Sequence, residues 1–151
     1  MLRPSKKLSL AVEAVVDIGL HAGKSPVPSQ EIGERLGLPR RYLEQVMQQL
    51  VRAGILKGVR GPRGGYRLAR EQRRVTVGDV FRIVQSGEAE AEAGVAAPES
   101  RLAQRVMTPF WQEIEREIVG KLDGVTIEDL CKRAREAGVN VAVADLADFN
   151  I

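Results

Sequence analysis

The sequence contains a single cysteine, Cys131, and no apolar run approaching the length of a membrane span. One cysteine excludes an intrachain disulfide framework and any all-cysteine metal site within one chain. The N-terminal residues also lack the cleavage pattern of a secretory signal peptide. These absences predict a cytoplasmic protein that has no contact with a membrane.

Residue groups that carry catalysis are missing as well. We find no paired carboxylates in an apolar setting, no nucleophile beside a base and no lysine-type phosphate loop. The one histidine, His21, stands at an expected helix end and is interpreted as a cap or core residue rather than a metal ligand. The sequence therefore argues against an enzyme and predicts no catalytic residue, metal ligand or cofactor.

What the sequence does contain is enough apolar material for a folded core. Hydrophobic residues make up 44% and charged residues 28% of the 151 positions, as in ordinary globular chains. The length fits one domain, or a small domain with an appended helical module.

Residues 39–53 have the pattern of an amphipathic helix. Pro39 suits its first position, where a missing N–H costs nothing. Apolar residues recur at three- and four-residue spacing on one side: Leu43, Val46, Met47, Leu50 and Val51. The other side is polar and rich in hydrogen-bond donors: Arg40, Arg41, Glu44, Gln45, Gln48 and Gln49.

Two helices are expected before it, at residues 6–22 and at 30–36 with Ser29 as the N-cap. Residues 25–28 are interpreted as an extended linker between them. Since Gly37 and Leu38 form a short turn into the helix at 39–53, the second and third helices have the helix-turn-helix pattern.

A hairpin is expected directly after the helix at 39–53. Residues 55–59 and 66–68 are predicted strands, and the turn between them, residues 60–65, holds three glycines and two arginines. A helix followed by a hairpin with a basic tip is the plan of a winged helix. In that plan the helix enters the major groove and the tip reaches the backbone or the minor groove.

Positive charge is concentrated in the same stretch. Residues 35–74 hold eleven Lys/Arg and two Glu, a net charge of +9, whereas the whole chain carries only +3. Segregation of this kind is the electrostatic footprint of a nucleic-acid-binding protein.

The C-terminal half is predicted to be helical. Thr76 to Asp79 is a capping box that opens a helix to about Ser86, and residues 87–99 are interpreted as a flexible acidic loop. Apolar residues then recur every four positions from 102 to 122, a long helix that Pro109 should kink or restart. A second capping box at Thr126 opens a last helix, closed by Gly138.

The long helix carries more apolar surface than one small domain can easily cover, so we expect it to pack against a second subunit. The expected dimer core is Val106, Phe110, Trp111, Ile114, Ile118 and Leu122. The predicted fold is mostly α with a small β-hairpin wing (α+β). Its expected parts are a winged helix-turn-helix domain (1–86), the acidic loop (87–99), the dimerisation helices (100–138) and an unassigned tail (139–151).

Five fragments resemble, in order and spacing, the Rrf-type family of bacterial winged-helix regulators. This group includes the iron–sulfur cluster regulator, the nitric-oxide-sensing repressor and the cysteine-metabolism repressor. The matching fragments are Tyr42-Leu43-Glu44-Gln45, Gly54-Ile55-Leu56, residues 59–66, Thr76-Val77-Gly78-Asp79-Val80, and the Trp111 helix followed by residues 126–130.

The resemblance implies a homodimeric regulator, with repression as the expected mode, that binds a partly palindromic operator in double-stranded DNA. Recognition-helix residues would face the groove, the wing tip would lie beside it, and cations on the strands would hold phosphates. The predicted DNA-binding residues are Arg40, Arg41, Tyr42, Glu44, Gln45, Lys57, Arg60, Pro62, Arg63 and Arg67, with Arg70 as a further phosphate contact.

The chain departs from the cluster-binding members of that family. Their three cysteines would fall near Ala93, Glu99 and Arg105, and a histidine ligand would fall at Thr108. At the N-terminal ligand positions this chain has Leu8 and Val12. Because such clusters require thiolate ligands, we expect no iron–sulfur cluster held in the family's manner.

Three alternatives stay open from the sequence. Cys131 is interpreted as a structural thiol, but a redox sensor is the competing interpretation. Trp111 and Phe110 could line a cleft between the long helix and the winged domain that takes a small-molecule effector. The winged fold could also serve as a module that binds a partner protein.

Overall fold

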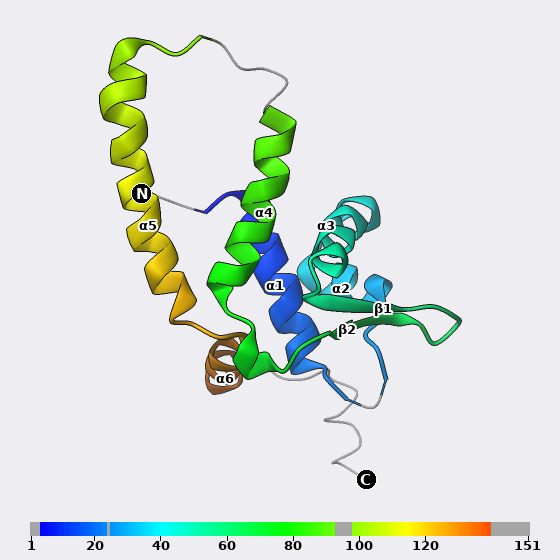
Figure 1. Ribbon diagram of the computed structural model, residues 1–151. Coiled ribbons are helices and arrows are strands. Elements are labelled where there is room, and N and C mark those ends of the chain that lie inside the picture. Colours follow the sequence, from blue (N-terminus) through cyan, green and yellow to red (C-terminus); the bar gives the residue numbers. More distant parts are fainter. Residues whose placement is uncertain (1–3, 24, 93–97, 140–151) are drawn as a thin grey trace.

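The computed structural model describes residues 4–23, 25–92 and 98–139. Helices dominate it and one antiparallel hairpin accompanies them, which confirms the predicted fold class (Figure 1). The elements in chain order are α1 (Lys6–Leu20), α2 (Ser29–Leu36), α3 (Arg40–Arg52), β1 (Leu56–Val59), β2 (Gly65–Leu68), a 3₁₀ turn (Gln72–Arg74), α4 (Val77–Glu92), a π-helical turn (Ala103–Met107), α5 (Thr108–Asp123) and α6 (Ile127–Glu136).

The hydrophobic core forms around α1. One side of this helix is fully buried because small and β-branched residues, Ala11, Ala14, Val15 and Ile18, allow close approach of its neighbours. The buried face of α3 packs onto it with the residues that the periodicity predicted: Leu43, Val46, Met47 and Leu50. No helix within the described residues combines the length and hydropathy needed to cross a membrane.

The helix-turn-helix forms as predicted, although both helix starts differ by one residue. Pro28 and Pro39, both extended, are the N-cap positions of α2 and α3, so Ser29 is the first residue of α2 and not its cap. Gly37 adopts the left-handed conformation (φ +67°) that the tight turn requires.

The wing is a two-stranded antiparallel sheet in which Leu56 pairs with Leu68 and Val59 with Gly65. The segment predicted as a linker also joins it. Val27 and Tyr66 exchange two backbone hydrogen bonds of 2.9 and 2.8 Å. This short bridge ties the hairpin to the chain that enters α2, a pairing that no local pattern could reveal.

Helix α4 opens with the predicted capping box, since Thr76 and Asp79 each accept the other's backbone N–H. It continues to Glu92, so the prediction of a flexible loop from residue 87 was wrong for residues 87–92. The alternating Glu and Ala residues there lack apolar periodicity but have high helix propensity, which explains the error. Residues 93–97 of the predicted loop lie outside the described residues.

Helix α5 runs back alongside α4, in the opposite direction (Figure 1). The interruption expected at Pro109 appears as the π-helical turn directly before it, followed by α5 with proline in its first turn. A wider turn removes the clash between the proline ring and the preceding carbonyls.

Helix α6 packs against α1 and not along α5, although the sequence grouped it with the dimerisation helices. Its capping box at Thr126 and Asp129 forms as predicted. Ile127 and Cys131 enter the core with no exposed surface, and Ile127 N–H donates to Val75 O at 2.8 Å. The winged domain is therefore completed by a helix from the far end of the chain.

Candidate nucleic-acid interface

Helix α3 presents a polar face to the solvent. Burial of Leu43 and Met47 turns Arg40, Arg41, Tyr42 and Gln45 outward, and all four side chains are exposed. Donors and acceptors of these types match base edges and phosphates in a DNA groove. The structure thus brings together the helix residues predicted to bind DNA.

Two residues of this face make contacts within the protein. Glu44 is half-buried and accepts a 3.0 Å hydrogen bond from Arg40 Nε, one helical turn away. Burial, with a smaller contribution from the nearby Glu44 carboxylate, raises the pKa of the Tyr66 phenol. Glu44 therefore lies close both to Arg40 and to Tyr66 of the wing, and its carboxylate orients the Arg40 guanidinium.

Gln49 does not belong to the exposed face, in contrast to the sequence interpretation. Its Nε2 atom donates a 2.8 Å hydrogen bond to the Ile83 carbonyl of α4. Gly87 makes this approach possible, because a Cβ at that position would clash with the Gln49 amide. Gln49 thus holds α3 against α4.

The wing tip extends away from the body of the molecule, on the same side as α3 and opposite α5 (Figure 1). Arg60, Pro62 and Arg63 are exposed there. Gly61 has φ +115°, which favours glycine, and a Cβ at Gly64 would clash with the Val59 carbonyl oxygen. These glycines form the tight turn that holds both arginines at the tip.

Lys57 and Arg67 lie directly opposite each other on β1 and β2. Both are exposed, and cations at such positions suit contact with a phosphate.

Arg35 is one of the eleven cations counted in the basic stretch, but it faces the protein. Its Nε and Nη2 atoms donate to the two carboxylate oxygens of the buried Asp17, each at 2.9 Å. These hydrogen bonds raise the pKa of the Arg35 guanidinium. This ion pair holds α2 against α1. No sequence pattern predicted it, because eighteen residues separate Arg35 from Asp17.

Cys131 lies in the core and its Sγ is 3.6 Å from the Val16 carbonyl oxygen. Burial raises the pKa of the thiol. Since the thiolate is the reactive form, this environment supports the structural interpretation over a redox sensor.

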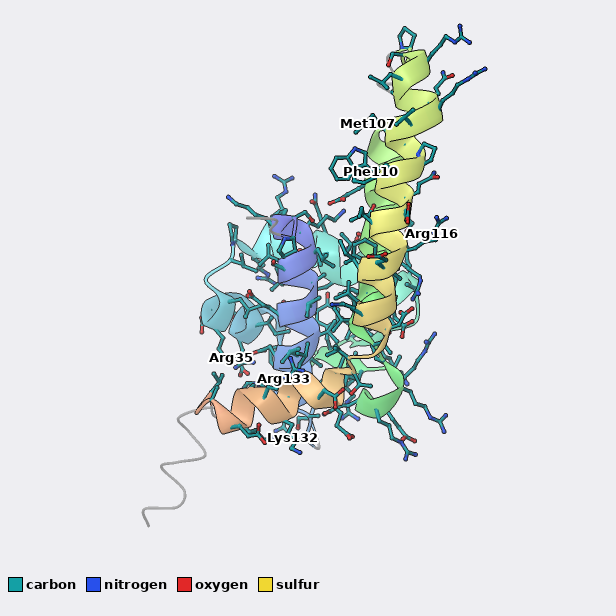
Figure 2. All side chains as sticks on the ribbon, turned by 90° about the vertical axis from the view of Figure 1, so that its left-hand side faces the viewer. Arg35, Met107, Phe110, Arg116, Lys132 and Arg133 are labelled. Atoms are coloured by element: carbon teal, nitrogen blue, oxygen red, sulfur yellow. The ribbon has the colours of Figure 1, made fainter. Side chains whose placement is uncertain are left out.

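The predicted dimerisation residues all lie on the α5 side of the molecule. Val106, Phe110, Trp111 and Ile118 are exposed, and Ile114 and Leu122 are half-buried. Phe110 and Trp111 contact each other edge to face, with ring centroids 5.1 Å apart. Figure 2 shows Met107, of the π-helical turn, and Phe110, of α5, on the part of this helical segment that extends beyond the winged domain.

Comparison with known proteins places this geometry in a family. The Rrf2 model, described as "Iron-dependent Transcriptional regulator", matches residues 4–133. The HTH-type transcriptional regulator IscR of Xenorhabdus nematophila is 34% identical over 149 residues, 97% of this chain and 85% of the relative. IscR of Vibrio atlanticus is 34% identical over 140 residues, 87% of this chain and 76% of the relative.

Solved structures agree. T. potens IscR superposes with a TM-score of 0.70 at 38% identity and covers 90% of both chains. CymR, the global cysteine regulator of B. subtilis, gives a TM-score of 0.67 at 28% identity, covering 88% of this chain and 98% of its own. These names confirm the expectation of a DNA-binding regulator and not an enzyme.

The residues at the expected cluster positions do not fit an iron–sulfur cluster. Glu99, Arg105 and Thr108 offer no thiolate, Leu8 and Val12 offer no ligand atom, and the only cysteine lies in the core. No group of three or more potential metal ligands occurs in the described ranges. With the fold, the exposed basic elements and the matched length in agreement, the chain belongs to the Rrf2 family of transcriptional regulators.

Proposed function

We propose that the protein is a homodimeric repressor that binds a partly palindromic operator without the help of an iron–sulfur cluster. The observation that carries this proposal is the separation of two surfaces. The α3 and wing surface is cationic, and α5 carries an exposed apolar stripe on the other side of the molecule. A two-fold dimer through α5 would present two copies of the cationic surface to one duplex.

The division of labour follows from the side chains. Arg40, Arg41 and Gln45 at the start of α3 can form hydrogen bonds with base edges, and Tyr42 can pack against them. Arg60 and Arg63 at the wing tip suit the neighbouring backbone or minor groove. The opposed cations Lys57 and Arg67 suit phosphates, which add affinity but no sequence preference.

Selection from a random-sequence duplex library, followed by mobility-shift assays between 50 and 200 mM salt, tests this function. We expect a consensus with two related half-sites about one helical turn apart. Affinity should fall steeply with salt, because bound phosphates release counterions. Recovery of no consensus, or affinity independent of salt, would contradict operator binding.

The contribution of the wing tip to operator binding is tested by a double variant, Arg60→Ala with Arg63→Ala. We expect weaker operator binding and a salt dependence less steep by about one unit for each lost phosphate contact. The matched control is Arg133→Ala with Arg135→Ala, which removes the same charge from exposed positions on α6. Equal losses in both variants would show that net charge, and not the wing, decides affinity.

A further inference from the structure

The last turn of α5 meets the first turn of α4 in a close contact. Gly78, the second residue of α4, is buried, and a Cβ there would overlap the Asp123 carboxylate. Arg82, one helical turn further along α4, donates a 2.5 Å hydrogen bond to the same carboxylate, and its guanidinium also lies 3.7 Å from Asp79. Since glycine destabilises a helix relative to alanine, the room that Asp123 needs explains a glycine at this position.

The chain segments beside this contact are joined as well. The Val77 N–H donates to the Val125 carbonyl oxygen at 2.9 Å, and the Ile127 N–H donates to the Val75 carbonyl oxygen at 2.8 Å. These two hydrogen bonds form an antiparallel bridge between the start of α4 and the start of α6. The C-terminal end of α5 is therefore fixed to the winged domain. We call this assembly the α5 joint: Gly78, Arg82, Asp123 and the two backbone hydrogen bonds.

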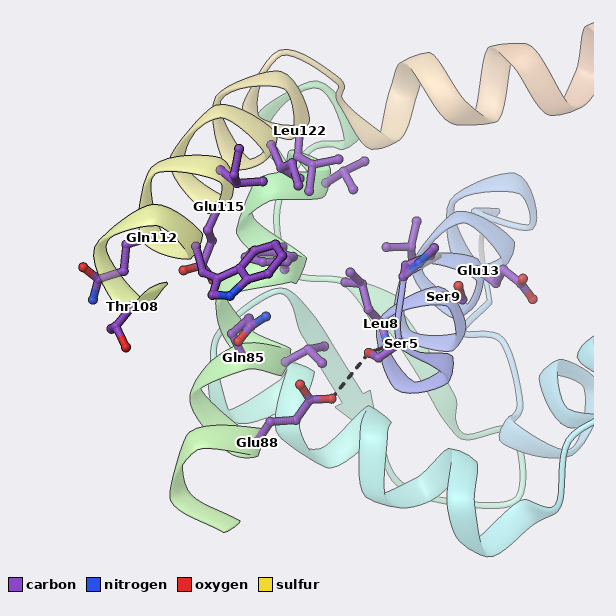
Figure 3. Close-up of a pocket in the computed structure, with 18 residues that line it drawn as sticks. Ser5, Leu8, Ser9, Glu13, Gln85, Glu88, Thr108, Gln112, Glu115 and Leu122 are labelled. Carbon is purple, nitrogen blue, oxygen red and sulfur yellow. Dashed lines mark hydrogen bonds between the residues drawn. The ribbon is translucent and has the colours of Figure 1, made fainter. Parts of the chain in front are cut away.

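Away from the α5 joint, α5 packs only lightly against its own chain. No residue of α5 or of the π-helical turn before it is buried. A mainly apolar groove lies between α1, α4 and α5 (Figure 3). Four residues of the proposed dimer contact line this groove: Trp111, Ile114, Ile118 and Leu122. In the proposed dimer a second copy would fill the groove, and its position would depend on the direction in which α5 leaves the joint.

A small change of that direction has a large effect at the other end of the helix. The 16 residues of α5 span about 24 Å at the rise of an α-helix. A rotation of about 10° at the α5 joint would move the other end by about 4 Å, which is close to the rise of one base pair in duplex DNA. Because the second copy would be bound along α5, its winged domain would move by a comparable distance.

We propose that the α5 joint sets the spacing between the two half-sites that the dimer accepts. This inference rests on the proposed function, since it requires a dimer through α5 and an operator with two half-sites. Arg82 and Asp123 are positioning residues here, because they fix the angle between α4 and α5 and with it the distance between the two recognition helices. An exposed ion pair contributes little to stability, so loss of this one should leave the fold intact.

The test measures affinity as a function of half-site spacing. A set of duplexes carries the two selected half-sites, and their centre-to-centre distance increases by one base pair from each duplex to the next. Mobility-shift assays give the affinity for each duplex. We expect a single optimum for the wild type, with binding at least about tenfold weaker one base pair to either side.

Two variants disturb the α5 joint. Asp123→Ala removes the carboxylate that receives the Arg82 hydrogen bond, and Gly78→Ala displaces this carboxylate without a change of charge. In both, the optimum should shift by about one base pair, or the preference for it should fall to about threefold or less. The consensus within each half-site should stay the same, because α3 and the wing are unchanged.

The matched control is Glu71→Ala. It also removes one carboxylate from an arginine, since Glu71 accepts a 2.6 Å hydrogen bond from Arg73, outside the α5 joint. This variant should keep the spacing profile of the wild type. Circular dichroism and analytical ultracentrifugation verify the fold and the dimer of every variant.

Three results would overturn the inference alone: a wild-type profile in either folded joint variant, an equal change in Glu71→Ala, or a monomeric Asp123→Ala protein. The last result would mean that Asp123 acts in the dimer contact and not through the angle of α5. A wild type that selects no paired half-sites would overturn the proposed function and this inference with it. The wild-type measurement therefore distinguishes the two failures.

Discussion

The long polar side chains of the helix-turn-helix differ in what they contact. Arg35 and Gln49 hold the fold, through Asp17 of α1 and the Ile83 carbonyl of α4. Arg41 and Gln45 are exposed on α3. Residues of similar type on one pair of helices therefore serve two purposes, and substitutions can separate them.

Gln45→Ala and Gln49→Ala should have opposite consequences. Loss of the Gln49 hydrogen bond should lower the free energy of unfolding by about 1 kcal/mol. Gln45 is exposed, so its loss should change stability by no more than about 0.5 kcal/mol but reduce operator discrimination. Urea denaturation and mobility-shift assays measure the two effects. A stability loss confined to Gln45→Ala would contradict the assignment.

Because Cys131 is buried, the free energy of unfolding should depend on pH in the alkaline range. Because its pKa is raised in the folded protein, the unfolded chain releases the thiol proton first, from about pH 8.5 upward. The contribution to stability is complete below that pH and is lost as the pH rises through the raised pKa of the folded state. Unfolding free energies between pH 7.5 and 9.5 should therefore decline more steeply for wild type than for Cys131→Ala.

The same burial predicts slow chemistry at the thiol. A thiol reagent such as iodoacetamide should modify native Cys131 about 100-fold or more slowly than the denatured chain, because reaction requires an opening of the core. Mass spectrometry over a time course measures both rates. Rapid modification of the native protein would restore the redox-sensor interpretation.

Among the elements, the wing depends most on backbone geometry. Gly65 lies where β2 meets the Val27 segment, and a Cβ there would overlap the Val27 carbonyl oxygen. A Cβ added at Gly58, in the facing strand β1, would instead meet open space. The two glycines therefore provide a matched pair within one hairpin.

Gly65→Ala should lower the free energy of unfolding by about 2 kcal/mol, since the backbone must move to admit the methyl group. Gly58→Ala should stay within about 0.5 kcal/mol of wild type. Thermal or urea denaturation of both variants measures this difference. Similar effects at the two positions would show that the bridge between Val27 and Tyr66 contributes little.

At the scale of the whole molecule, the winged domain faces one way and the apolar stripe of α5 another. Val106, in the π-helical turn, and Phe110, in α5, keep 54% and 46% of their surface exposed. Neither of these two elements has a buried residue. Such a surface is typical of a site for protein association. The proposed dimer would cover it and place two wings on one operator.

Phe110→Glu should produce a monomer with an intact winged domain, because Phe110 does not belong to the core. Operator affinity should fall by about 100-fold or more, since the two half-sites would no longer be bound by one linked unit. Analytical ultracentrifugation and mobility-shift assays measure both. Gln104→Glu adds the same charge at another exposed position of this helical segment and is the control. A Phe110→Glu variant that stays dimeric would contradict the proposed interface.

Features that depend on neighbours within about four positions could be predicted from the order of the residues alone. Both capping boxes, the apolar face of α3, the glycine turn of the wing and the interruption at Pro109 were all predicted. Their physical causes are local hydrogen bonds, steric limits and helical periodicity, which a linear reading contains. The concentration of cations in one stretch was equally visible.

Which of the long polar side chains face outward depends on how the helices pack in three dimensions. This packing holds the Arg35 guanidinium on Asp17 and the Gln49 amide on Ile83. It also pairs Val27 with the wing and buries Cys131 against a carbonyl 115 positions earlier in the chain. Helix α4 likewise packs against α1, which lies far from it in the sequence. Burial and electrostatic environment arise from contacts between such distant segments, and for this reason no local pattern could reveal them.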